Sequence, residues 1–364
     1  MTRTPDPPPP VHRGPGFLAE AKDAVTLRAA VLVFGVLALQ LAFITSYIGA
    51  FHEPTPHEVP LAVVAPTQPV AQEAARRLAD LPGDPLDTRV VTDEATARKQ
   101  IENREIDGAL VVRPRSTSDT LLVASASGAS LAQAIEETVA DAQRAERRSL
   151  TVVDVVPDSP GDARGLSSFY LVIGWCVGGY LCAAVLAISA GARPANTHRA
   201  LIRLGVLLVY SIVAGLLGTV IAGPILGALT GSVPALWGLG SLLVFTVGAI
   251  TLALQGLAGI VGIGLAILLV VVLGNPSAGG AYPYPLLPPF WKAIGPALPP
   301  GAGTFAARSI TYFRGQAMTG PMLVLSAWAV GGALLTLLCA RLRREPTPEP
   351  AERSGPPTAD RTGA

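Results

Sequence analysis

The chain of 364 residues is 50% hydrophobic, with a mean hydropathy of +0.47, and only 15% of its residues are charged. Soluble domains usually carry about 25% charged residues, so this composition excludes an ordinary soluble protein. The net charge is only +1, and no basic, aromatic-rich stretch indicates nucleic acid as a partner.

The acidic side chains are distributed very unevenly along the chain. Between His52 and Arg164 there are 19 acidic and 12 basic side chains, whereas no Asp or Glu occurs between Asp162 and Glu345. Residues 204–291 carry no charged side chain at all. One membrane span needs about 20 apolar residues, so this stretch predicts several spans. Ion-driven transporters usually keep an acidic residue in the membrane, so the missing carboxylates disfavour ion coupling.

We expect residues 1–28 to form a cytoplasmic tail that precedes the first span. Its proline-rich beginning is expected to be disordered. Residues 17–28 fit either an amphipathic helix on the membrane surface or the cytosolic start of the first span. Residues 29–51 are predicted to form the first transmembrane helix, which is too long for a signal-peptide core and is therefore retained.

Residues 52–165 are predicted to form one α/β domain outside the membrane. Its apolar, strand-like runs alternate with amphipathic helical patterns, which favours a mixed sheet with helices packed on it. The runs cover residues 59–65, 89–92, 108–112, 121–126 and 150–156, and the helical patterns cover residues 69–81, 93–105 and 130–148. Thr92 is the expected N-cap of the second helix. All three cysteines lie outside this domain, in apolar spans, so no disulfide framework is expected.

Residues 166–341 are predicted to contain five further spans. These spans cover residues 166–192, residues 204–229, two stretches within 236–274 joined by a turn near Gln255 and Gly256, and residues 321–340. The expected fold is an α-helical polytopic membrane protein with six transmembrane helices and an extracytoplasmic α/β domain between helices 1 and 2. Basic clusters then fall on one side, which predicts a plasma-membrane protein with cytoplasmic N- and C-termini. Residues 342–364 are expected to be a disordered cytoplasmic tail.

Residues 275–320 differ from the spans around them, because they mix prolines with aromatic side chains and carry no acid. Such a segment is typical of the outer membrane interface, with residues 304–314 as an interfacial helix in contact with membrane lipid. A partly re-entrant cap and an ordinary hydrophobic loop both fit this pattern. The candidate interfacial residues, of which the two arginines suit anionic head groups, are Trp291, Lys292, Arg308, Tyr312 and Arg314.

No motif for catalysis, nucleotide binding or metal binding is found. The sequence has no Gly-Lys-Ser or Gly-Lys-Thr of a P-loop and no Gly-x-Ser-x-Gly of a nucleophile elbow. His52 and His57 are separated by two prolines, so no helix can present both to one metal ion. We therefore expect neither catalytic residues nor a cofactor, and we interpret this stretch as a linker.

Three stretches carry a resemblance to a known family. VPLAVVAPTQPVAQEAARRLADL at residues 59–81 resembles the family's strand-then-helix opening, and ATARKQIENREIDGALVV at 95–112 resembles its helix-to-strand step. NPSAGGAYPYPLLPPFWKAIGPALPPGAGTFAARSITYFRG at 275–315 is similar to the external segment before its last span. With this layout the chain resembles the ABC type-2 exporter permeases, and more closely their YhgE/Pip-like (phage infection protein) branch.

The resemblance implies a permease subunit that forms a homodimer or heterodimer and is driven by a separate cytoplasmic ABC ATPase. In that family a cytoplasmic segment after the second span couples to the ATPase. The matching residues here are Arg193, His198, Arg199 and Arg203. The exported molecules are expected to be hydrophobic, lipidic or envelope-related. The alternative is a non-transport membrane receptor or scaffold for cell-envelope assembly that uses the external domain.

Overall fold

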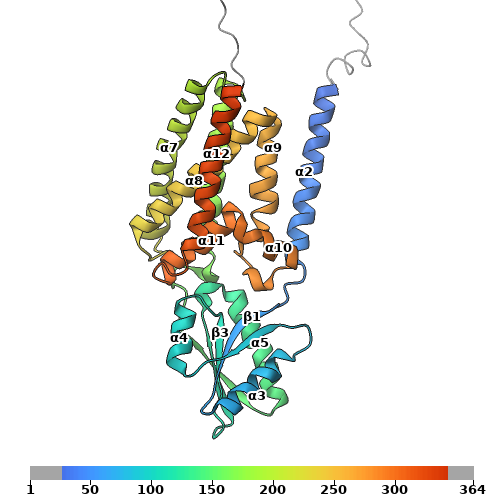
Figure 1. The fold of residues 1–364 in the computed structure, drawn as a ribbon, viewed down its shortest axis with the longest axis vertical. Helices are drawn as coiled ribbons and strands as arrows, with labels where there is room; N and C mark the ends of the chain where they lie inside the picture. The colour runs from blue at the N-terminus through green and yellow to red at the C-terminus, as the bar shows by residue number, and fades with distance from the viewer. Residues whose placement is uncertain (1–26, 343–364) are drawn as a thin grey trace, which may run out of the picture.

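The computed structural model describes residues 27–342, which form a group of long helices joined at one end to an α/β domain (Figure 1). The expected surface helix at residues 17–28 and the expected C-terminal tail lie almost wholly outside the described residues. The first long helix begins, and the last one ends, at the end of the helical part that faces away from the α/β domain (Figure 1).

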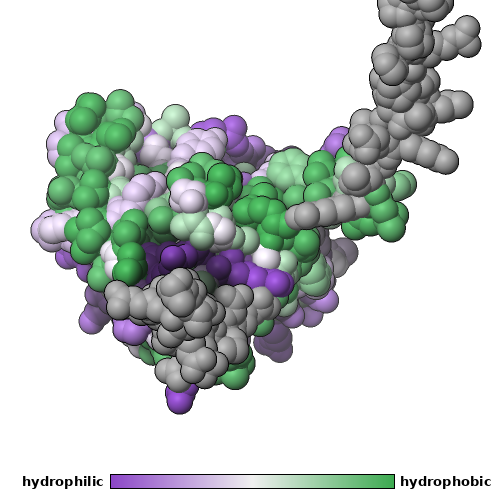
Figure 2. All heavy atoms as spheres, turned by 90° about the horizontal axis from the view of Figure 1, so that it is seen from above, coloured by the Kyte–Doolittle hydropathy of each residue, from purple (hydrophilic) through white to green (hydrophobic). Residues whose placement is uncertain are grey.

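Five described helices are long and apolar enough to cross a membrane. Helices of 24 to 26 residues reach about 36–39 Å, which exceeds the roughly 30 Å hydrocarbon core of a bilayer. Seen from above, hydrophobic residues gather in several places on the helical part, with hydrophilic residues between them (Figure 2), and each of these helices exposes large apolar side chains. The five helices are α2 (Leu27–Phe51), α6 (Ser167–Ala190), α7 (Thr197–Val220), α8 (Val233–Ala258) and α12 (Thr319–Leu342).

The remaining expected span is shorter than a bilayer core. It consists of α9 (Val261–Ile267) and the π-helical segment η4 (Leu268–Leu273). Its 13 residues extend only about 20 Å, so six spans remain a prediction. The turn expected near Gln255 and Gly256 is wrong, because both residues are buried inside α8. The helix ends instead at Gly259, whose φ of 62° suits a residue without a Cβ.

Helix α2 stands apart from the other helices along most of its length (Figure 1). In an apolar stretch of 18 residues within α2 only 6% is buried, compared with 67% in the corresponding stretch of α8. Its contacts gather near its end, where the Ser46 hydroxyl donates to the carbonyl of Val272 and the Tyr47 hydroxyl bonds to the amide of Asn275. Most of α2 therefore presents apolar side chains with little protein against them within residues 27–342.

The α/β domain contains a five-stranded mixed sheet, as the alternating pattern predicted. The strand order is β2-β1-β3-β4-β5, and β3 with β4 is the antiparallel pair among parallel neighbours. The strands are β1 (Val59–Val64), β2 (Leu86–Val90), β3 (Gly108–Val111), β4 (Ser118–Val123) and β5 (Ser149–Asp154), and the helices are α3 (Gln68–Ala79), α4 (Glu94–Glu102) and α5 (Ala129–Ala145). The N-cap expected at Thr92 is wrong, since Asp93 caps α4 by accepting from the Thr96 N–H at 2.8 Å.

The two faces of the sheet bury different apolar clusters, because alternate strand residues point to opposite faces. Leu61 and Leu110 pack with α3 and α5 on one face, and Ala62 and Leu122 pack with α4 on the other. Each cluster also takes in one side chain from the segment that follows η4. Those side chains are Leu286 and Phe313, each 2% exposed. The cores of the domain are therefore completed by the helical part.

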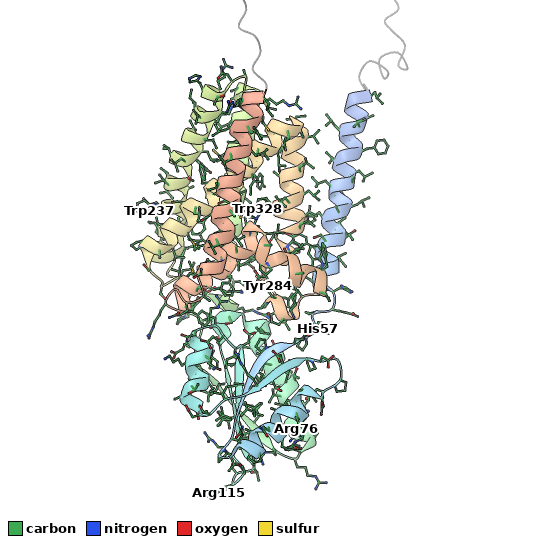
Figure 3. The ribbon with its side chains drawn as sticks, viewed as in Figure 1. His57, Arg76, Arg115, Trp237, Tyr284 and Trp328 are labelled. Atoms are coloured by element: carbon green, nitrogen blue, oxygen red, sulfur yellow. The ribbon has the colours of Figure 1, made fainter. Side chains whose placement is uncertain are left out.

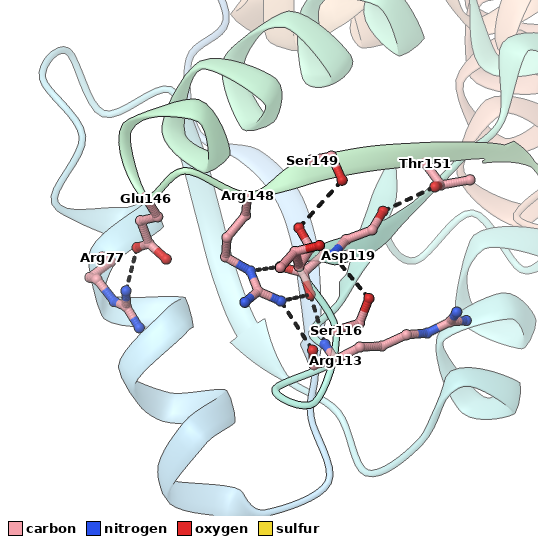
Figure 4. A network of polar contacts seen from close by, with 10 residues as sticks. Arg77, Arg113, Ser116, Asp119, Glu146, Arg148, Ser149 and Thr151 are labelled. Carbon is pink, nitrogen blue, oxygen red and sulfur yellow. Dashed lines mark hydrogen bonds and ion pairs between the residues drawn. The ribbon is translucent and has the colours of Figure 1, made fainter.

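A buried ion pair holds the end of the domain where β3, β4 and β5 meet (Figure 4). The Asp119 side chain is 1% exposed, and its carboxylate accepts from Nε and Nη2 of Arg148 at 2.7 Å each. The backbone N–H of Arg113 donates to the same carboxylate at 2.7 Å. This bidentate pair ties the start of β5 to the β3–β4 connection, away from the helical part.

Residues 275–320 lie between the helices and the α/β domain (Figure 1). They form η5 (Pro276–Ala278), η6 (Tyr284–Leu286), α10 (Pro289–Ile294), η7 (Gly295–Ala297) and α11 (Pro299–Tyr312). Ala302 and Ala306 of α11 belong to the same core cluster as Val172 of α6 and Leu243 of α8. The expectation of a helix lying on the lipid surface at residues 304–314 is therefore wrong. Small side chains let α11 pack among its neighbours.

Candidate functional site

A pocket of about 250 Å³ lies where the α/β domain meets α10 and α11. Tyr284, which lines it, is seen at this junction in Figure 3, with His57 nearby. The domain contributes residues from the start of β1 and from the α4–β3 connection, and the helical part contributes residues of η6, α10 and α11. The charged side chains of the lining are Glu58, Arg104, Asp107, Lys292 and Arg308.

Arg104 joins the α/β domain to α11. It follows the end of α4 with a φ of 63°, a left-handed conformation that turns the chain toward β3. Its Nη1 donates to the carbonyl of Phe305 at 2.9 Å and to Oγ of Ser309 at 2.7 Å. Its guanidinium lies 3.5 Å from the ring centroid of Phe305 and 4.8 Å from that of Phe313. Hydrogen bonding and cation–π contact thus act on the same turn of α11.

Arg308 is buried, with only 3% of its surface exposed, and is held by carbonyl groups. Its Nη1 donates to Gly279 at 2.6 Å, and its Nη2 donates to Gly280 at 2.8 Å and to Gly165 at 3.3 Å. Gly165 lies two residues before α6, so this one side chain ties α11 to the preceding loop and to the residues that lead into α6. Arg308 is therefore buried inside the protein and not exposed on its surface, contrary to the expectation from its sequence position.

Asp107 lies in the same lining, close to Arg104. Burial raises the pKa of its carboxyl to about 6, and the positive charge of Arg104 opposes that rise. Burial likewise lowers the pKa of Arg104 to about 9, with further lowering from the nearby charge of Arg308. Among residues 27–342 the Asp107 carboxylate makes no hydrogen bond or ion pair, so its ionised form is poorly stabilised here.

The mouth of the pocket is marked by Lys292 and Glu58. Their side chains are 34% and 74% exposed, and Nζ of Lys292 lies 3.4 Å from Oε2 of Glu58. The same Nζ donates to the carbonyl of His57 at 3.3 Å. An ion pair this exposed adds little stability, so Lys292 is free to exchange Glu58 for another anion.

A second hollow is an apolar groove of about 480 Å³ lined by residues of α6, α7 and the segment after α7, together with Val244 of α8. Trp175 forms part of its wall and donates from Nε1 to the carbonyl of Ala214 at 3.2 Å. Gly174 lies in the groove with open space where a Cβ would stand, whereas Gly178 lies close to the hydroxyl of Tyr210. The groove carries no charged residue in its lining.

The residues expected to couple to an ATPase lie in the connection between α6 and α7, which holds Arg193, and in the first two turns of α7. Arg203 is 5% exposed, and its Nη2 donates to Ala190 at 2.8 Å and Gly191 at 2.7 Å, where α6 ends. Arg193 donates to the carbonyl of Leu257 at 3.1 Å, at the end of α8. Cations at these positions complement helix C-termini. His198 and Arg199 remain exposed.

The structure brings together only part of the predicted interfacial set. Lys292 and Arg308 line the pocket, whereas Trp291, Tyr312 and Arg314 do not. The Tyr312 hydroxyl donates instead to the buried carboxylate of Asp162, and Arg314 is exposed. Sequence reasoning missed Arg104 and Asp107 entirely. The helix expected over residues 93–105 ends at Glu102, and the turn that follows carries both.

No protein-family model matches this chain, and no curated protein matches it either. The features of the molecule that bear on its function are therefore the pocket, the groove and the region where α6 is joined to α7.

We predict that Asp107→Asn removes a pH-dependent destabilisation of the α/β domain. The folded-state pKa of about 6 exceeds the ordinary value of about 3.9, so the folded protein binds this proton more tightly than the unfolded chain does. Stability should therefore fall as pH rises from about 4 to 6 and stay lower above that range. At pH 7.5 the Asn variant should be more stable than wild type by about 1 kcal/mol, and at pH 4 the difference should vanish.

Hydrogen exchange of the β1 and β3 amides in the full-length protein, measured from pH 4 to 8, checks this. Asp87→Asn is the matched control, since Asp87 is exposed on β2, and it should behave as wild type. A constant difference between Asp107→Asn and wild type across the range would contradict the assignment.

Proposed function

We propose that this chain is the permease subunit of an ATP-driven exporter of hydrophobic, lipidic or envelope-related molecules. The observation that carries the proposal is the uncharged groove between α6, α7 and α8, whose aromatic and glycine lining suits an apolar cargo. The groove lies between helices that are long enough to span a membrane, so a lipid-soluble molecule would reach it from the membrane.

The source of energy follows from what the chain lacks. No Asp or Glu occurs between Asp162 and Glu345, so none of the helices from α6 to α12 offers a carboxylate for ion coupling. The sequence also has no P-loop, so ATP hydrolysis belongs to a separate ABC ATPase. We place that partner at the exposed pair His198 and Arg199, on the end of the helices that faces away from the α/β domain. This end is cytoplasmic in our proposal, as are both termini.

Dimerisation of two permease chains is part of the same proposal. Support comes from α2, which presents apolar side chains along most of its length, and from the sequence resemblance. In the alternative, a receptor or scaffold for envelope assembly, the α/β domain carries the function and the groove is only a surface of the helix packing. Filling the groove distinguishes the two proposals.

We predict that Gly174→Leu weakens export without disturbing the fold. A Cβ at this position meets nothing within 4 Å, so the leucine occupies the groove instead of clashing with the protein. Efflux of a lipophilic dye from cells that express the chain with its ATPase should fall about tenfold, the equivalent of about 1.4 kcal/mol of lost cargo binding.

The matched control is Gly331→Leu on α12, where a Cβ also meets nothing within 4 Å and which lies outside the groove lining. Its efflux should equal that of wild type. Unchanged efflux in Gly174→Leu, with normal expression, would favour the scaffold alternative.

We predict a separate effect of Arg199→Glu on the partner. Reversing an exposed charge at a docking surface should weaken co-purification of the ATPase about tenfold while leaving the helices folded. Arg341→Glu is the control, because Arg341 is also exposed and lies at the same end of the helical part (Figure 1). Equal recovery of the ATPase with both variants would remove the α6–α7 connection from the docking surface.

A further inference from the structure

Two buried hydrogen-bond donors of the pocket have no acceptor among residues 27–342. Nε of Arg308 is without a partner, although both of its Nη atoms are used. The hydroxyl of Tyr284 is also buried and without a partner. Folded proteins give nearly all such donors an acceptor, because an unmet buried donor is costly. Tyr284 and Arg308 both line the pocket, so these two unmet donors belong to side chains of its wall.

The charged side chains that line the pocket also leave it short of negative charge. Arg104, Lys292 and Arg308 outnumber Glu58 and Asp107. Neither arginine forms an ion pair with any carboxylate in the described part of the chain. The charge of Arg308 is close enough to lower the pKa of Arg104. Two neighbouring guanidinium groups without a direct ion pair are unfavourable away from water, and an anion between them would reduce that cost.

We propose that this pocket binds one phosphate group, either of a lipid head group or of a free phosphate ion. A phosphate offers acceptor oxygens in several directions, which matches donors that arrive from three different elements. Those donors are Arg104 from the α4–β3 connection, Tyr284 from η6 and Arg308 from α11. Guanidinium groups are the side chains best suited to phosphate oxygens.

The dimensions and the mouth of the pocket fit such a ligand. Its volume of about 250 Å³ holds one phosphate group with room for the atoms attached to it. Lys292 stands at the exposed mouth, where it can attract the anion. Asp107 opposes binding, because its ionised carboxylate repels an incoming anion. Binding of a lipid phosphodiester, which keeps its single negative charge over this range, should therefore strengthen as the pH falls toward 5.

A bound phosphate would hold the α/β domain and α11 together, because its donors come from both. The site does not depend on export, so it can be tested whether or not the chain is a permease. It differs from the apolar groove in chemistry and in location, and no residue is shared between the two linings.

The test uses the full-length protein in lipid nanodiscs and has one arm for each source of phosphate. In phosphatidylcholine nanodiscs, inorganic phosphate should raise the unfolding temperature, whereas chloride at equal ionic strength should not. In phosphate-free buffer, phosphatidylglycerol nanodiscs should raise it instead, and native mass spectrometry should find the lipid retained. The first result identifies a free phosphate as the ligand, and the second identifies a lipid head group.

The decisive variant is Tyr284→Phe, which removes only the unpartnered hydroxyl and leaves the ring in place. Loss of one hydrogen bond to a charged ligand should weaken binding about tenfold. The matched control is Tyr282→Phe, since Tyr282 packs on the sheet cluster and lies outside the pocket lining. Arg308→Lys keeps the charge but removes Nε and the fork geometry, so it should also weaken binding.

Two results would overturn the proposal. One is that neither inorganic phosphate nor phosphatidylglycerol stabilises the wild-type protein. The other is that Tyr284→Phe and Arg308→Lys, both folded, bind the effective probe as tightly as wild type and Tyr282→Phe do.

Discussion

The contact of Arg104 with α11 holds the α/β domain against the helical part of this protein. One side chain from the α/β domain donates to Phe305 and Ser309 and lies over the rings of Phe305 and Phe313. A cation–π contact contributes about 0.5–2 kcal/mol, depending on how dry it is. Because Phe313 also completes the cluster beneath α4, the same contact joins the core of the domain to the helices. The pocket exists because this contact brings the α4–β3 connection against α11.

Helix α11 carries that contact into the helices. Its small residues allow it to pack against α6 and α8, and Arg308 fastens it to Gly165 in front of α6. A second link is Asp162, whose carboxylate accepts from the Tyr312 hydroxyl and from the Ser167 N–H. Ser167 is also part of the groove lining. A movement of the α/β domain would therefore act on α11 and then on the helix that borders the groove, which links the pocket to the proposed cargo path.

The parts of the fold that depend on periodicity could be predicted from the sequence. Long uncharged runs predicted five of the spans, and the alternation of apolar runs with amphipathic patterns predicted the mixed sheet. Predictions failed where a single backbone conformation decides the outcome. Gln255 stays helical because its amide finds the carbonyl of Ala183 at 3.3 Å, so the chain turns only at Gly259.

The candidate site was harder to predict than the fold for a related physical reason. Arg308 follows a pattern that suits a lipid surface, and only tertiary packing supplies the carbonyl groups that let it be buried. The helical pattern of the sequence continues through Arg104, although the helix ends before it. Its role depends on a partner about two hundred positions away in the sequence, which no local pattern indicates. The pocket and the groove are each formed by segments that are far apart in the sequence, so no local sequence pattern predicts either of them.

The most direct test of this account is hydrogen exchange of α11 in Arg104→Ala. If Arg104 joins the two parts, exchange should rise at least about tenfold in residues 299–313 and in the α4–β3 connection, because about 1.4 kcal/mol or more of local stability is lost. Arg115→Ala, at an exposed site on the far end of the domain (Figure 3), should leave both segments unchanged. Unchanged protection of α11 in Arg104→Ala would contradict the claim that this side chain couples the α/β domain to the helices.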